Sequence, residues 1–195
     1  MKKYELLVDD TITFFGVQLF RIKALISFSG IEKGEVGGYI ASEKNLSQYG
    51  DAWVYGDARV SGNARVSGDA RVYGDAWVSG DARVYGDAWV YGDARVYGNA
   101  RVSGDARVYG NARVSGDARV YGDADYIVFK NTWSSGRYFT YTKSNKKWRV
   151  GCFYGNGHEL IKKAYKDSQK SGDFYKAYVE FVEKLEEIEK IHKEQ

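Results

Sequence analysis

Small apolar residues recur with a period of six between residues 50 and 124, and this pattern dominates the chain. Each hexad reads Gly-Asp/Asn-Ala-Arg/Trp-Val-Tyr/Ser, without an insertion, a deletion or a proline. Alanine and valine stand two positions apart, so they face one side of a short strand while their larger or polar neighbours face the other. A period of six is neither helical nor that of one long alternating strand, so the hexad itself is the structural unit.

The Gly-Asp/Asn pair of each hexad predicts a corner. Glycine accepts a positive φ, and Asp or Asn tolerates the left-handed region better than other residues that have a side chain. Three strands and three corners close one triangular turn of eighteen residues, and the next turn stacks about 4.8 Å above it. The interior then holds only alanine and valine, which suits a narrow prism.

The hexads resemble the hexapeptide repeat of left-handed β-helix proteins, in which a small residue follows an aliphatic one four positions later, as Ala58 follows Val54. This resemblance covers residues 50–124 and implies a left-handed coil. The flanking segments also resemble an uncharacterised family carried by prophages and gut bacteria, whose members are often labelled transferases. The matching segments are KKYELL…LFRIKAL, KGEVGGYIASEKNLSQ and DYIVFK…SSGRYFTYT…VGCFYG.

The segments on either side of the repeat predict caps, because an open end of a β-helix exposes an unpaired strand edge. Residues 1–49 read as an N-terminal β-cap with a hairpin at Gly16 and an irregular first coil. Residues 125–195 read as a small α+β module that ends in two helices. The expected fold is therefore mostly β, with a left-handed parallel β-helix over residues 50–124 between these two caps.

The C-terminal module combines alternating strands with helical periodicity. Strands are expected in DYIVFK, RYFTYTK and KKWRVGCFY, a helix from Gly157, and a second helix after a break at Ser171-Gly172-Asp173. The second helix carries an apolar stripe at spacings of four and three, which we expect to pack on the adjacent hairpin. Self-association as a short coiled coil is the alternative. The stripe consists of Phe174, Tyr178, Phe181, Leu185 and Ile188, with Val182 widening it.

The charge and the cysteine content indicate the cellular compartment of the protein more clearly than its function. The net charge of +3 divides into 0 for residues 1–49, −1 for residues 50–124 and +4 for residues 125–195, and none of these is typical of a nucleic-acid-binding domain. The single cysteine, Cys152, excludes an internal disulfide, fits a reducing cytoplasm and is expected to face a small core. No apolar run is long enough to span a membrane, and the first residues predict no secretory signal. We therefore expect a protein of the bacterial host cytoplasm without a membrane partner.

Candidate catalytic residues are few. Left-handed β-helix acyltransferases use a histidine base, whereas the coils contain none, and His158 and His192 fall at helix positions of the C-terminal module. Two histidines cannot supply the three-histidine metal site of carbonic anhydrases with this fold. Asp alternates with Asn at the corners, so ordered calcium is not expected there either. The sequence predicts no catalytic residue, no metal and no cofactor.

The outward positions of the hexads are the remaining candidates for function. The position before valine is Arg nine times and Trp three times, and the position after it is Tyr seven times and Ser five times. Such side chains dominate protein interfaces and stack on single-stranded bases, although they also stabilise one another in ladders. The eighteen-residue turn assigns them to columns. The candidate contact residues are Trp53, Tyr55, Arg71, Tyr73, Trp89, Tyr91, Arg107 and Tyr109 on one face and Arg65, Arg83, Arg101 and Arg119 on another.

These features predict a non-catalytic interaction protein, encoded by a phage or prophage, that presents Arg/Tyr/Trp ladders to a macromolecular partner. The resemblance to a prophage family makes an inhibitor of a host defence or nucleic-acid-handling protein, as in an anti-CRISPR-like role, the most concrete version. The partner is expected to be a host protein or a protein–nucleic-acid complex, with direct nucleic-acid binding as an alternative. A hexapeptide-repeat acyltransferase and a viral structural or assembly component also remain open. So does a homo-oligomer through the C-terminal helix or a β-helix face.

Overall fold

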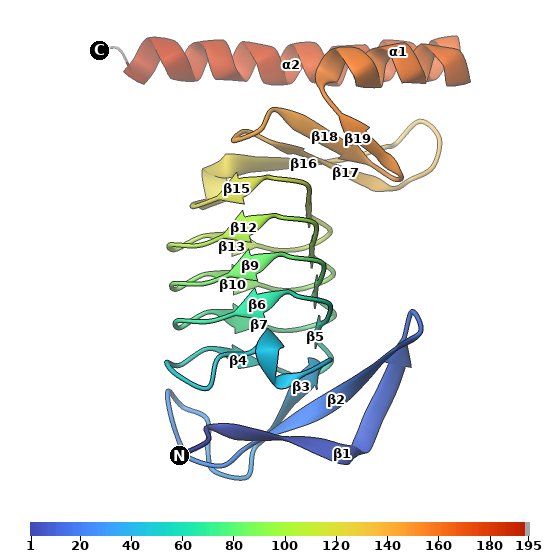
Figure 1. The fold of residues 1–195 in the computed structure, drawn as a ribbon. Helices are drawn as coiled ribbons and strands as arrows, with labels where there is room; N and C mark the ends of the chain where they lie inside the picture. The colour runs from blue at the N-terminus through green and yellow to red at the C-terminus, as the bar shows by residue number, and fades with distance from the viewer. Residues whose placement is uncertain (194–195) are drawn as a thin grey trace.

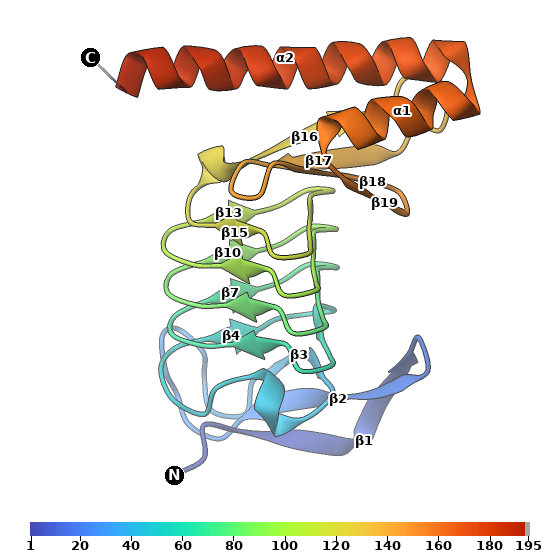
Figure 2. The same ribbon diagram turned by 45° about the horizontal axis from the view of Figure 1, so that its top comes forward.

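The computed structural model describes residues 1–193. They form a mostly-β protein in which a parallel β-solenoid occupies the centre, a β-hairpin closes one end, and a small sheet with two helices closes the other (Figure 1). The N-terminus lies at the hairpin end, and the long last helix crosses the opposite end (Figure 2). The last two residues of the predicted C-terminal module, 194 and 195, lie outside the described residues.

Each hexad forms a strand of two residues at its Arg-Val or Trp-Val step. Strands of successive turns pair in parallel eighteen residues apart, as Arg65 pairs with Arg83. Three such ladders line the solenoid, and one of them runs through β3, β5, β8, β11 and β14, so there are about five turns. The coil strands are β4 (Trp53–Val54), β5 (Arg59–Val60), β6 (Arg65–Val66), β7 (Arg71–Val72), β8 (Trp77–Val78), β9 (Arg83–Val84), β10 (Trp89–Val90), β11 (Arg95–Val96), β12 (Arg101–Val102), β13 (Arg107–Val108), β14 (Arg113–Val114) and β15 (Arg119–Val120).

Alanine and valine fill the interior, as the hexad pattern predicts. Every alanine and valine from Ala52 to Val120 is at most 1% exposed. The backbone N–H groups of one turn donate to carbonyls of the next, as Arg59 N does to Ala76 O at 2.9 Å. The solenoid therefore has a direction. The carbonyl groups of each turn point toward the N-terminal end, which we call the lower end, and the N–H groups point toward the C-terminal end, the upper end.

Glycine turns the chain at each corner, with φ between +55° and +72° from Gly50 to Gly116. The positive φ predicted for these glycines is confirmed. The reasoning for the Asp or Asn that follows was wrong, because the positive-φ residues other than glycine are Phe15, Ser29 and Lys146 within the described chain. Corner side chains instead bond along the solenoid, as Asn63 Nδ2 does to Asp81 Oδ1 at 3.1 Å.

The N-terminal cap is built on the predicted hairpin. β1 (Tyr4–Phe14) and β2 (Val17–Ala24) are antiparallel and turn at Phe15-Gly16. β3 (Val36–Ile40) pairs antiparallel with β2 and parallel with β5, so it continues the hairpin into the coils. The 3-10 helix η1 (Glu43–Asn45) follows, and Leu46 then forms an isolated parallel bridge with Val66.

The C-terminal module is an antiparallel sheet covered by two helices (Figures 1 and 2). The 3-10 helix η2 (Asp123–Asp125) connects the last coil to it. Its own core contains Phe139, Trp148, Leu160, Val179 and Val182. The elements are β16 (Tyr126–Lys130), β17 (Tyr138–Thr142), β18 (Lys147–Val150), β19 (Phe153–Gly155), α1 (Gly157–Asp167) and α2 (Gln169–Lys193).

Two predictions for this module were wrong in their details. Cys152 is exposed in the turn that joins β18 to β19, because Gly151 at φ +56° reverses the chain there. The helices break at Ser168 and not at Ser171-Gly172-Asp173. Gly172 stays helical because α1 packs against its bare backbone: a Cβ at Gly172 would lie 2.1 Å from Cδ1 of Tyr165.

The apolar stripe predicted on the last helix packs on the sheet side only in part, since Val182 is buried in the core and Tyr178 packs against it. Tyr175, Val179 and Val182 are buried, whereas Phe174, Phe181 and Ile188 are 39%, 51% and 42% exposed. α2 adopts this rotation because aromatic rings of the sheet side contact its other face. Ring centroids of Trp133 and Tyr175 are 4.8 Å apart, and those of Phe139 and Tyr175 are 5.4 Å apart.

Candidate binding surface of the solenoid

The outward side chains form three columns, in the registers that the eighteen-residue turn predicts. We call the set on β6, β9, β12 and β15 the arginine column, the set on and beside β4, β7, β10 and β13 the tyrosine column, and the set on β5, β8, β11 and β14 the mixed column. The arginine column contains Arg65, Arg83, Arg101 and Arg119. The tyrosine column contains Trp53, Arg71, Trp89 and Arg107 within the strands, and Tyr55, Tyr73, Tyr91 and Tyr109 directly after them.

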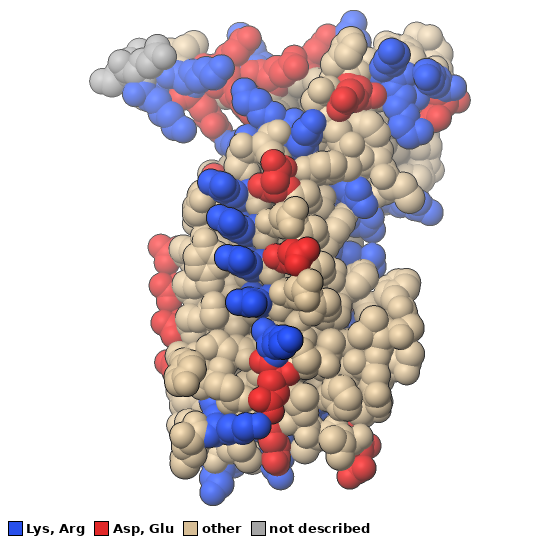
Figure 3. Space-filling view, in the orientation of Figure 1, with Lys and Arg blue, Asp and Glu red and all other residues tan. Residues whose placement is uncertain are grey.

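The arginine column is exposed along its whole length. All four arginines are solvent-exposed, and Figure 3 shows the basic side chains as a band over the coils, with acidic side chains at the flanks. Among residues 1–193, none of the four guanidinium groups lies within 4.0 Å of a carboxylate oxygen. A shallow hollow of about 280 Å³ lies along the column. Its lining consists of Arg65, Ser67, Arg83, Tyr85 and Arg101.

The tyrosine column is largely engaged with itself. The rings of Tyr73 and Tyr91 stack at 4.8 Å and 4°, and those of Tyr91 and Tyr109 stack at 5.4 Å and 15°. Arg71 and Arg107 lie over the ring of Trp89, at 5.4 and 5.3 Å from its centroid. Burial raises the pKa of Tyr73 above its ordinary value, the neighbouring Tyr91 adds to this, and the nearby arginines oppose it. Much of this column thus stabilises the coils.

Trp53 is not available as a contact residue, which corrects the sequence prediction. Its side chain is fully buried because the N-terminal cap covers it. The rings of Tyr4 and Phe28 meet Trp53 edge-on, at centroid distances of 6.2 and 5.5 Å. The hexad pattern treats Trp53 like Trp89, and only the fold of the cap distinguishes them.

The β1–β2 hairpin covers part of the mixed column. Phe15 stacks on Trp77 at 5.3 Å, and the guanidinium of Arg59 lies 4.5 Å from the ring of Phe14. These contacts could not be read from the repeat, because Phe14 and Phe15 come from a segment outside it. Of the three columns, the arginine column is left the most open.

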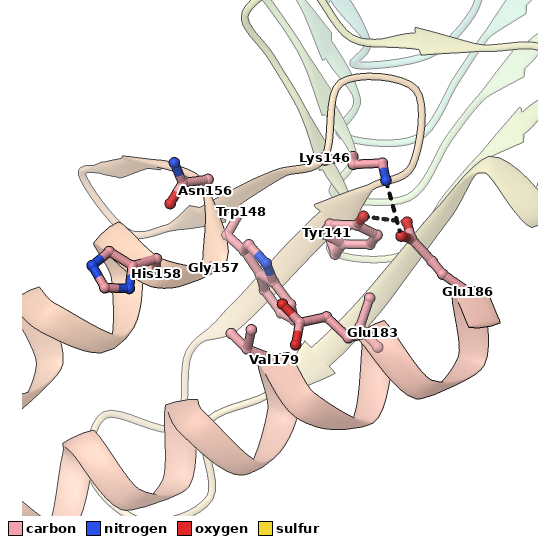
Figure 4. Close-up of a pocket in the computed structure, with 10 residues that line it drawn as sticks. Tyr141, Lys146, Trp148, Asn156, Gly157, His158, Val179, Glu183 and Glu186 are labelled. Atoms are coloured by element: carbon pink, nitrogen blue, oxygen red, sulfur yellow. Dashed lines mark hydrogen bonds and ion pairs between the residues drawn. The ribbon is translucent and has the colours of Figure 1, made fainter.

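A second candidate site lies between the C-terminal sheet and α2, where the structure forms a cavity of about 310 Å³. Tyr141 donates a hydrogen bond to Glu186, and Lys146 Nζ lies 3.4 Å from the same carboxylate (Figure 4). Burial, reinforced by the hydrogen bond to Glu186, raises the pKa of Tyr141 well above its usual range. His158 lies across the cavity from Glu186. The cavity is lined by Tyr141, Lys146, Trp148, Asn156, Gly157, His158, Val179, Val182, Glu183 and Glu186.

These polar groups of the cavity serve to hold α2 on the sheet. Glu186 links α2 to β17 and to the turn before β18, and Lys143 makes a parallel ion pair with Glu189 at 2.5 Å. The sequence contains no sign that Glu183, Glu186 and Lys146 are neighbours, because nothing in their spacing connects a helix to a turn about forty residues earlier. His158 is exposed at the start of α1, as predicted, and so is His192 near the end of α2.

The comparison with known families agrees with the coil geometry, and together they define a β-solenoid repeat protein. The YdcK beta solenoid repeat matches the chain over residues 52–66, 64–80, 76–92, 94–110 and 106–122, all within the coils. No curated protein matches the chain. Within residues 1–193, no helix is both long and apolar enough to cross a membrane. In the same residues, no three His, Cys, Asp or Glu side chains come together as a metal site would require.

Proposed function

We propose that this protein is a non-catalytic binding protein whose arginine column contacts an acidic surface of a protein partner. The observation that carries the proposal is the row of four exposed arginines on paired strands, which stack about 4.8 Å apart, without a carboxylate neighbour in the described chain. Like charges this close repel one another, and an anionic partner removes that cost on binding.

The chemistry of arginine supports a contact with carboxylates. Each guanidinium presents a planar fork of donors that can hold a carboxylate by two hydrogen bonds. A rigid solenoid keeps the four forks in line, so little side-chain or backbone order has to be gained on binding. Arg, Trp and Tyr are also the residues most enriched at energetic centres of protein interfaces.

We place the contact on the arginine column and not on the tyrosine column. The tyrosine rings already stack on one another, and the arginines beside them lie over Trp89. Side chains that are satisfied within the protein gain less from a partner than exposed and unpaired ones. Tyr85 and Tyr121, which are 36% and 53% exposed beside Arg83 and Arg119, add aromatic surface to the arginine column.

The finer parts of the proposal rest on resemblance. The spacing of valine and alanine in the hexad supports a left-handed coil, and the flanking segments support an origin in a phage or prophage. On that basis the partner is a protein of the bacterial cytoplasm that acts in defence or handles nucleic acid. Such partners often present acidic or phosphate-rich surfaces, and occupation of that surface by the arginine column would inhibit them.

Affinity capture with a matched pair of variants tests the proposal. The Arg83→Ser, Arg101→Ser variant removes two central charges from the arginine column, and the Arg95→Ser, Arg113→Ser variant removes two from the mixed column. We expect a host protein that co-purifies with the wild type from nuclease-treated lysate to be lost, at least about tenfold, only with the first variant. Quantitative mass spectrometry of the three captures measures this.

The outcomes separate the candidate partners. Capture that both variants retain equally would contradict a role for the arginine column. Binding that nuclease treatment abolishes, and that falls with salt in proportion to the arginines removed, would replace the protein partner by a nucleic acid. The first variant should melt within a few degrees of the wild type, since Arg83 and Arg101 are exposed. The second should melt somewhat lower, since Arg113 is half-buried and Arg95 lies over the ring of Trp77.

A further inference from the structure

The α2 helix carries an apolar stripe that the C-terminal module covers only in part, since Phe174 stacks on Trp133 with ring centroids 4.6 Å apart and still remains exposed. Phe174, Phe181 and Ile188 follow one another at intervals of seven residues and are between 39% and 51% exposed. Ile191 extends the row and is 57% exposed. A seven-residue interval places side chains along one seam of a helix, which is the geometry of a helix–helix contact.

The stripe continues into a groove at the edge of the sheet. Phe129 of β16 lies at its base, with its ring 5.0 Å from Tyr178 and 6.4 Å from Phe181. The hollow has a volume of about 380 Å³ and no charged side chain in its lining. It is lined by Phe129, Phe174, Ala177, Tyr178 and Phe181. Contiguous apolar surface of this kind on a soluble domain marks a site of association.

We infer that this stripe is the interface of a homodimer in which two α2 helices pack antiparallel, with the two-fold axis at Phe181. The stripe is self-complementary about that residue, because Phe174 and Ile188 lie seven positions on either side of it. The axis therefore places Phe181 on its own copy and Phe174 against Ile188 of the second copy. A two-fold interface requires this reciprocity.

Charged residues along the edge of the stripe favour the antiparallel orientation. Around an axis at Phe181, Glu180 lies within about 3 Å along the helix of Lys184 of the second copy, and the reverse pair forms by symmetry. In a parallel pair the two-fold axis runs along the helices, so the charged edges of the two copies lie on opposite sides of the pair and Glu180 does not meet Lys184. Like charges at such positions destabilise a helix pair, and opposite charges stabilise it.

The dimer would present two arginine columns from one rigid assembly. This inference stands apart from the proposed function, because α2 and the arginine column lie on different parts of the molecule (Figures 1 and 3). A partner with two acidic surfaces would then gain affinity through effective concentration and not through new contacts. Loss of the dimer and loss of the arginine contact can be measured separately.

Sedimentation of the full chain between 1 and 100 µM tests the oligomeric state. We expect a species of twice the 22.0 kDa chain mass. The Phe181→Glu, Ile188→Glu variant should raise the dissociation constant at least about 100-fold, since it brings carboxylates together at the seam. Val8→Glu is the matched control, because Val8 is 71% exposed on the distant hairpin and its replacement should leave the dimer unchanged.

Cysteine cross-linking tests the orientation. In a Cys152→Ser background, Phe174→Cys and Ile188→Cys proteins should form a disulfide dimer under mild oxidation when mixed, and little when alone. Cross-linking of each variant with itself would show a parallel pair and contradict the axis. A chain that stays monomeric to 100 µM, or a dimer unaffected by the glutamate substitutions, would overturn the interface and leave the stripe to a different protein.

Discussion

Lys3 shows how a single side chain closes the lower end of the solenoid. The carbonyls of the first turn have no coil beneath them, and Lys3 Nζ donates to Gly50 O at 3.0 Å and to Ala52 O at 2.9 Å. The side chain is only 2% exposed, and its burial lowers the pKa of Lys3 to about 8 although Asp51 and Asp69 oppose the shift. A charged group is thus retained where the backbone needs a donor, at a cost in desolvation.

The first prediction concerns the pH dependence that follows from this shift. Because the pKa of Lys3 lies lower in the folded than in the unfolded chain, the unfolded chain binds more protons between pH 8 and 10.5. The free energy of unfolding should therefore rise with pH in this window, by at most about 2 kcal/mol at pH 9.5. Denaturant titrations at pH 7 and 9.5 of the wild type and of a variant without Lys3 measure it, because tyrosines such as Tyr4, whose pKa burial raises in the folded chain, oppose the rise near pH 9.5.

Lys3→Met is the control for this effect. Methionine removes the titrating group but keeps an unbranched chain of similar length, so the rise between pH 7 and 9.5 should shrink by the contribution of Lys3. An equal rise in both proteins would show that other groups cause it. The variant should also lose stability at pH 9.5, because the buried carbonyl of Ala52 and the partly buried carbonyl of Gly50 lose their donor.

At the scale of the element, the corner is where the hexad is most constrained. The corner glycines stack directly on one another, so a side chain at one of them meets the backbone of the next turn. A Cβ at Gly68 would lie 2.9 Å from the backbone N of Gly86, whereas nothing lies within 4 Å of one at Gly110. Glycine is therefore required in the middle turns for two reasons: the corner needs a positive φ, and the next turn leaves no space for a Cβ.

A pair of alanine substitutions separates these two requirements. Gly68 and Gly110 have φ values of +69° and +60°, so alanine costs about 1–2 kcal/mol at either position through backbone strain. We expect Gly68→Ala to lose at least about 1 kcal/mol more than Gly110→Ala, because the coils must move apart. Chemical denaturation of both variants measures the difference. Equal losses would mean that the turns absorb a methyl group without strain.

The helices of the C-terminal module show the limit of local signals. Ser171-Gly172-Asp173 has the composition of a helix break and N-cap, yet the chain is helical through it. Packing overrides propensity because the ring of Tyr165 fills the space that Gly172 leaves, and its hydroxyl donates to Asp173 Oδ1 at 2.9 Å. The actual break, at Ser168, contains no glycine or proline from which it could have been predicted.

At the scale of the whole molecule, the two caps complete the hydrogen bonds of the solenoid in opposite ways. Donor side chains satisfy the carbonyls of the lower end, and Asn45 Nδ2 bonds Gly62 O and Ala64 O at 3.0 and 2.8 Å. At the upper end, side-chain oxygens accept from free N–H groups of the last turn. These bonds are Arg107 N to Asp123 Oδ1, Arg113 N to Thr140 Oγ1 and Arg119 N to Ser144 Oγ, at 2.8 to 3.0 Å.

The contribution of Trp53 to stability depends on the N-terminal cap, because the cap forms the environment of its side chain. Arginine is the commonest residue at this position of the hexad, so the repeat alone would accept Trp53→Arg and Trp89→Arg equally. We expect Trp53→Arg to lose at least about 3 kcal/mol, because it buries a charge below the cap and leaves space around Tyr4 and Phe28. Trp89→Arg should lose less, about 1–2 kcal/mol, because it removes only the contacts of Arg71 and Arg107 with a half-buried indole.

Thermal or chemical denaturation of the two tryptophan variants measures this contrast. The result also reports on the attachment of the hairpin, since Trp53 packs between the coils and residues 1–49. A Trp53→Arg protein as stable as Trp89→Arg would mean that the cap does not hold its position over the first turn.

The coils follow from the sequence because each hexad repeats the same local choices. Alanine and valine point inward, glycine turns the chain, and the eighteen-residue turn then assigns every outward residue to its column, as the strand pairs show. Accessibility could not be assigned in the same way. Trp53, Trp77 and Trp89 are equivalent in the repeat, and residues far away in the sequence bury the first and stack on the second.

The tertiary structure also decided the rotation of α2 and the exposure of Cys152. A helix with aromatic residues on two faces can bury either one: Tyr175 is buried against Trp133 and Phe139, whereas Phe174 stacks on Trp133 alone and stays exposed. The geometry of a periodic segment can be predicted from its sequence, because each repeat packs against another repeat of the same sequence pattern. The caps and the C-terminal module pack unlike surfaces together, and which surfaces meet is a property of the folded molecule.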